Sequence, residues 1–211
     1  MRNLSKAWWL MALCGAGEAM CAAMNLLTLN LGGWPVLRRF ALPGTVSDMS
    51  MLALLAGICA IAAGLWNLGR DRAWMLSLHG LALGTFGFIG VSPLVKGPLS
   101  FRPISLLLVL MAISLGAFAW ATARTLRSGV AGKLFLKVSE AASIGFSLSF
   151  VAVGFGWLRL GPPPSYWIWM SSYFGFCAIV MLWFALRVRG RGIQESAPID
   201  ALPQLGSPGH A

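Results

Sequence analysis

Three ionisable side chains, Glu18, His79 and Glu140, lie inside long apolar stretches of the sequence. Ionisable groups within a membrane span are costly and commonly mark a functional site. Glu18 stands roughly 16 Å into the first stretch at 1.5 Å per helical residue, near the middle of a bilayer. Because burial disfavours the charged form of such groups, the three side chains predict a proton-responsive cluster. The alternative is that Glu18 is a hydrogen-bonded packing contact and that His79 and Glu140 reach the nearer membrane surface.

Glu18 belongs to a stripe of polar and sulfur-containing residues whose spacing alternates between three and four. The stripe comprises Met11, Cys14, Glu18, Cys21, Asn25 and Thr28. This spacing places them on one helix face, which makes Asn25 a fourth candidate functional residue. Sulfur ligands such as Met11, Cys14 and Cys21 beside Glu18 suit copper. No second ligand set accompanies them, so the sequence predicts neither a metal site nor a cofactor.

The sequence offers no pattern typical of an enzyme. It has no phosphate-binding glycine loop, no paired-cysteine zinc motif and no H-E-x-x-H helix. Its cysteines, Cys14, Cys21, Cys59 and Cys177, all fall in apolar stretches and predict buried, unpaired thiols. We therefore predict a non-enzymatic protein without catalytic residues.

The composition shows which elements must position these side chains. The 211-residue chain is 58% hydrophobic and only 10% charged, whereas soluble domains carry about 25% charged residues. Apolar stretches near the roughly 20 residues needed to cross a bilayer occupy residues 7–31, 49–68, 73–95, 104–123, 134–158 and 166–186. The sequence thus predicts an all-α integral membrane protein with six transmembrane helices. They form one domain, residues 1–191, followed by a disordered cytoplasmic tail, residues 192–211.

The basic residues predict how the helices are oriented in the membrane. The formal net charge is +10, and the Lys and Arg residues flank the apolar stretches. Eleven of the sixteen lie on the side of the two termini, so both termini are predicted to be cytoplasmic. Anionic lipid headgroups are the expected partners of these residues, and nucleic acid is not. The charge pattern leaves open whether the chain forms a homo-oligomer.

An internal repeat divides the six stretches into three helical hairpins, at about residues 7–68, 73–124 and 134–187. In the first helix of each, an aromatic residue (Trp9, Trp74 or Phe135) precedes small residues six and ten positions later. His79 and Glu140 occupy equivalent positions of this repeat. Small residues four apart let membrane helices approach closely. The predicted helix-packing residues are Gly15, Gly64, Gly80, Gly84, Gly116 and Gly145.

The second hairpin resembles the repeat of the HdeD family. The residues that carry the likeness are Arg72, Trp74, His79-Gly80, Gly84, Ser92-Pro93 and Gly116. The last hairpin is also similar, whereas the chain departs from the pattern in a long connection, residues 32–48, and at Ala141. The resemblance implies a bacterial inner-membrane protein built from three hairpins, with a role in acid resistance. It implies no catalytic residues.

Two other functions compete with this one. A small proton- or solute-conducting transporter or channel would use Glu18 on a path between hairpins. The polar stripe favours it, but the sequence has no clearly broken helix of the kind that transporters use. A membrane-embedded enzyme using Glu18 or His79 is a weaker alternative, because these residues are predicted to lie at different depths.

Overall fold

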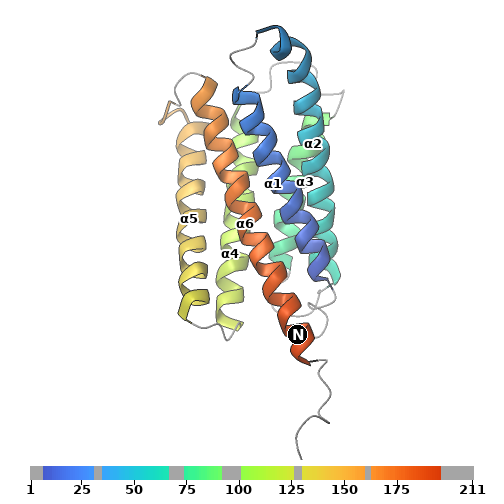
Figure 1. The fold of residues 1–211 in the computed structure, drawn as a ribbon. Coiled ribbons are helices and arrows are strands. Elements are labelled where there is room, and N and C mark those ends of the chain that lie inside the picture. Colours follow the sequence, from blue (N-terminus) through green and yellow to red (C-terminus); the bar gives the residue numbers. More distant parts are fainter. Residues whose placement is uncertain are drawn as a thin grey trace, which may run out of the picture.

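The computed structural model describes the backbone of residues 7–30, 35–66, 74–91, 101–125, 130–159 and 163–195, which is helical except at residues 7 and 155–159 and contains no strand. The helices are α1 (Trp8–Asn30), α2 (Pro35–Trp66), α3 (Trp74–Val91), α4 (Phe101–Thr125), α5 (Val130–Gly154) and α6 (Pro163–Glu195) (Figure 1). Each contains a segment long and apolar enough to cross a membrane. In the described residues, the predicted all-helical fold with six helices able to span a membrane is confirmed.

The outer surface of the bundle is apolar, as the surface of a membrane protein must be. Large aliphatic side chains are exposed along the spans, among them Leu13, Leu55, Ile113, Leu148 and Ile179. The buried side of the same helices carries small, aromatic and polar residues together with further leucines and methionines. Burying apolar side chains among neighbouring helices gains little over contact with lipid tails, so close packing and hydrogen bonds hold the helices together.

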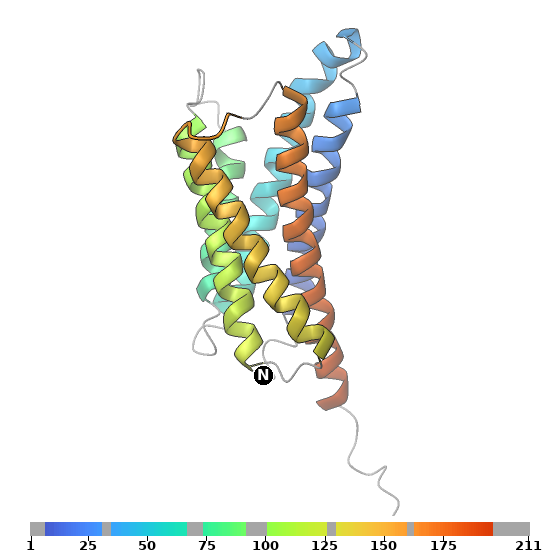
Figure 2. The same ribbon diagram turned by 90° about the vertical axis from the view of Figure 1, so that its left-hand side faces the viewer.

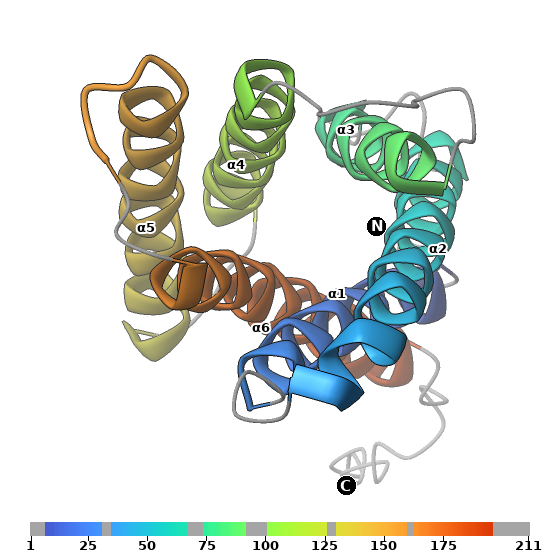
Figure 3. The same ribbon diagram turned by 90° about the horizontal axis from the view of Figure 1, so that it is seen from above.

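The helices form a ring in chain order, seen from above in Figure 3. Extensive contacts between α1 and α6 close the ring, and those between α2 and α3 and between α4 and α5 are also large. Each of these pairs joins different hairpins. α5 is inclined to the bundle axis (Figure 2) and meets α6 through aromatic rings, with the Phe150 and Tyr173 centroids 4.8 Å apart. The start of α1 and the end of α6 lie at the same end of the bundle (Figure 1).

Glycines bring α2 and α3 into backbone contact. A Cβ atom added to Gly80 would lie 2.6 Å from the Gly57 carbonyl oxygen and 2.7 Å from the Ile61 nitrogen. A Cβ on Gly57 would collide with the backbone of Gly84, and one on Gly87 with that of Leu54. Only residues without a side chain permit this separation, and it fixes α3 firmly against its neighbour.

Helices α2, α4 and α6 are longer than predicted, α2 and α6 by the most. α2 begins at Pro35, so most of the predicted connection at residues 32–48 is helical. A proline suits the first helical position, because its missing N–H would have no partner there and its φ angle is already helical. α6 continues to Glu195 and takes in the first four residues of the predicted tail. The remainder of that tail, residues 196–211, lies outside the described residues.

Candidate functional site

The candidate site begins with two side chains on the inner face of α1. Cys14 and Glu18 are four residues apart, so they lie one turn from each other on the same face. Both are completely buried. Because side chains on a helix lean toward its N-terminus, the Glu18 carboxylate points back to the level of Cys14. α1 thus presents a thiol and a carboxyl group together to the interior of the ring.

α3 supplies the partner of this carboxyl group. His79 is also completely buried, and its Nε2 atom lies 2.9 Å from Glu18 Oε1. Its other ring nitrogen, Nδ1, lies 3.1 Å from the carbonyl oxygen of Met111 in α4. The Glu18–His79 pair therefore connects three helices inside the membrane-spanning part of the bundle.

The Met111 contact assigns one of the two exchangeable protons of the Glu18–His79 pair. A backbone carbonyl only accepts hydrogen bonds, so Nδ1 carries a proton and donates it. Glu18 Oε1 and His79 Nε2 then share one further proton. It resides on the imidazole, giving an ion pair, or on the carboxyl group, giving two neutral partners. Both arrangements have zero net charge, which suits a site removed from water.

Cys14 completes a cluster with this pair. One potential ligand atom from each of Cys14, Glu18 and His79 lies within 4.8 Å of the others. The second carboxyl oxygen, Glu18 Oε2, is buried and has no hydrogen-bond partner among the described residues. We call Cys14, Glu18 and His79 the central cluster.

The structure does not place all four predicted functional residues together. Glu18 and His79 meet at one depth, whereas the sequence predicted different depths. Asn25 is buried two turns beyond Glu18 and donates from Nδ2 to the Cys21 carbonyl oxygen at 2.9 Å. Glu140 is half-buried on α5 and lines a groove of about 430 Å³ between α4 and α5, with Ser143 beside it. Of the predicted cluster of Glu18, His79 and Glu140, the structure brings together only Glu18 and His79.

Cys14 gains its importance from a contact that sequence reasoning missed. The polar stripe predicts that Cys14 acts with Met11 and Cys21 on its own helix, whereas the structure sets it beside His79. A signal for this was present in the repeat. Cys14 stands five residues after Trp9, as His79 stands five after Trp74, so the two positions are equivalent in their hairpins.

Most of the predicted packing glycines lie at helix contacts. A Cβ on Gly15 would approach Leu182 of α6 to 3.0 Å, and one on Gly116 would approach Ser143 of α5 to 2.8 Å. Gly64, Gly80 and Gly84 are buried. Gly145 differs, because it is exposed and a Cβ there would have no atom within 4 Å. The pattern missed Gly57 and Gly87, which contact α3 and α2 respectively.

Comparison with known proteins adds no relative: no family model, no curated protein and no solved structure matches the chain. The resemblance to the HdeD repeat therefore stays a prediction from the residues quoted above.

Proposed function

We propose that the protein is a non-enzymatic bacterial inner-membrane protein of the HdeD type that contributes to acid and envelope stress tolerance. The resemblance supplies this physiological setting. The buried Glu18–His79 pair, with its 2.9 Å contact, supports a role for these two ionisable side chains in that tolerance. We also propose that the six helices are three repeated hairpins, as the same resemblance implies.

The cost of the pair is the reason to assign it a role. Taking a carboxylate and an imidazolium out of water is expensive, and well-packed apolar side chains often replace such pairs with no loss of stability. Helix packing alone therefore does not require Glu18 and His79. Both side chains are 0% exposed, whereas a carboxylate on a water-filled path would be accessible. Their burial favours this proposal over a transporter with Glu18 on its path.

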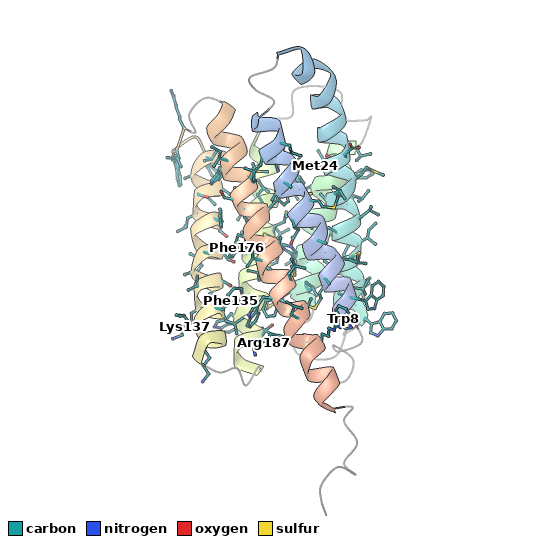
Figure 4. The ribbon with its side chains drawn as sticks, in the orientation of Figure 1. Trp8, Met24, Phe135, Lys137, Phe176 and Arg187 are labelled. Carbon is teal, nitrogen blue, oxygen red and sulfur yellow. The ribbon has the colours of Figure 1, made fainter. Side chains whose placement is uncertain are left out.

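The charged ends of the described helices support a cytoplasmic location for both termini. Lys137, Arg187 and Trp8 lie at the same end of the bundle (Figure 4). The guanidinium of Arg189 lies 4.8 Å from the Trp8 ring centroid, which brings α1 and α6 together there. Trp is typical of either membrane interface, whereas Lys and Arg are enriched on the cytoplasmic side, where they contact anionic headgroups.

Survival after acid shock tests the proposed function. A strain lacking the protein should survive less well than its parent, and the wild-type gene should restore survival. Glu18→Gln, which keeps the size of the side chain but removes its acidic group, should not restore it. Glu140→Gln is the matched control, because Glu140 lies away from the pair, and it should rescue as wild type does. Membrane levels of the wild-type protein and of each variant are matched by immunoblot. Equal survival of the deletion strain and its parent would contradict the proposed function.

A further inference from the structure

We propose that the central cluster binds a divalent, borderline-soft metal ion of the Zn²⁺ type through Cys14, Glu18 and His79. Each residue offers one ligand atom, and the three atoms lie within 4.8 Å of one another. Thiolate sulfur, imidazole nitrogen and carboxylate oxygen are the donors that Zn²⁺ takes in proteins. Metal binding goes beyond the stress-tolerance role and does not depend on it.

The orientation of His79 is that of a metal-binding histidine. Such a histidine generally donates its second ring N–H to a carboxylate or a backbone carbonyl, which fixes the ring and its tautomer. The Nδ1–H of His79 has this partner in the Met111 carbonyl, 3.1 Å away. Nε2 is then directed at the carboxyl group of Glu18, 2.9 Å away, and departure of the proton they share makes its lone pair available to a cation.

Glu18 provides the second, independent indication of a ligand. Its Oε2 atom is buried in a fully buried side chain, and the described residues offer it no hydrogen-bond partner. A buried carboxyl oxygen without a partner is costly, and a metal ion would satisfy it. Glu18 and Cys14, four residues apart, can both reach one ion from the same face of α1.

The distances are compatible with a tetrahedral ion after a small adjustment. Zinc bonds of about 2.0 Å to N or O and 2.3 Å to S place neighbouring ligand atoms roughly 3.3 to 3.6 Å apart. Glu18 Oε1 and His79 Nε2 are 2.9 Å apart, so the pair needs to open by about 0.4 Å. The Cys14 sulfur lies within 4.8 Å of the other ligand atoms, so it needs to move inward by up to about 1.3 Å, which rotation of its side chain can supply. With three protein ligands, a fourth position is left for water.

Charge balance selects a divalent ion over a monovalent one. Before binding, the thiol is neutral and the Glu18–His79 pair shares one proton, so the cluster is neutral. The incoming M²⁺ forms bonds to the thiolate, the carboxylate and the neutral imidazole, while the thiol proton and the shared proton leave. The charges of M²⁺, one thiolate and one carboxylate sum to zero. Exchange of M²⁺ for two protons therefore buries no net charge, whereas the same exchange with Cu⁺ would leave a negative site.

Cobalt and zinc binding to the full chain purified in detergent tests this site. Co²⁺ takes the same ligands as Zn²⁺ and gives a thiolate-to-metal charge-transfer absorption when a cysteine coordinates it. We expect one equivalent of Co²⁺ with this absorption, its displacement by Zn²⁺, and release of two protons per Zn²⁺ in weakly buffered solution. Cys14→Ser should abolish the absorption and weaken Zn²⁺ binding by more than the about 10- to 100-fold seen when an outer-shell partner is lost. His79→Gln, a second variant, should weaken it similarly.

Cys59→Ser is the matched control, because Cys59 is a half-buried thiol on α2 and should leave the absorption and the affinity unchanged. Retention of the absorption in Cys14→Ser, its loss in Cys59→Ser, or no stoichiometric binding by the wild-type protein would overturn the proposed site. Metal binding is measured on the purified wild-type protein, whereas the stress-tolerance role is measured as acid survival of the deletion strain, and either result can be obtained without the other. Failure of metal binding and failure of the stress-tolerance role are thereby separated.

Discussion

Replacing His79 by leucine is expected to lower the free energy of unfolding by about 3 kcal/mol, and replacing Glu18 by methionine by a similar amount. Each change leaves the other member of the pair buried without its partner. His79→Leu also removes the proton donor to the Met111 carbonyl, which is 3.1 Å from Nδ1. Both side chains are 0% exposed, so water cannot replace the lost contacts.

The double variant Glu18→Met/His79→Leu should be more stable than either single variant and within about 1.5 kcal/mol of wild type. Apolar side chains of similar size fill the space and leave neither partner unpaired. Equilibrium unfolding of the detergent-solubilised protein in SDS measures all four proteins of the cycle. Glu140→Met, at a half-buried site away from the pair, serves as the control and should shift stability by less than about 0.5 kcal/mol. Additive losses in the double variant would show that the two side chains do not act as a pair.

Replacing Gly80 by alanine is expected to destabilise the bundle by about 1 to 3 kcal/mol. The added Cβ would lie 2.6 Å from the Gly57 carbonyl oxygen and 2.7 Å from the Ile61 nitrogen. Both atoms belong to the backbone of α2, so relief requires that α2 and α3 move apart. Thermal unfolding monitored by circular dichroism measures the loss.

Gly145→Ala is the matched control, since Gly145 stands in the third hairpin where Gly84 stands in the second. A Cβ there has no atom within 4 Å, and alanine is about 1 kcal/mol better than glycine within a helix. Gly145→Ala should therefore leave stability unchanged or raise it slightly. A stabilising effect of Gly80→Ala would show that the α2–α3 separation is not set by these glycines.

The spans were predictable from the sequence because hydropathy and length decide them. The contact between Glu18 and His79 was not, because it depends on which helices are neighbours and on how far each is shifted along the membrane normal. The prediction placed Glu18 near mid-membrane and His79 closer to one surface. Neither estimate included the lean of the Glu18 side chain toward the N-terminus of α1, which removes part of the difference.

The repeat led to a different error for Glu140. Its equivalence to His79 predicted equivalent surroundings, yet α5 packs mainly on α4 and leaves Gly145 on the outer surface. Equivalent positions in the repeat lie on the same face of equivalent helices, but that face is defined only relative to the partner helix of the same hairpin. The order in which hairpins meet decides whether that face points into the bundle or toward lipid. Sequence periodicity does not contain that order.

The apolar double variant also gives the most direct test of the central claim, that the buried Glu18–His79 pair serves function and not packing. Acid survival should be measured in the deletion strain carrying wild type or Glu18→Met/His79→Leu, at matched levels of membrane-inserted protein. We predict that the double variant folds with near-wild-type stability and yet fails to restore survival. Full rescue by this variant would contradict the claim and reduce the pair to a packing contact.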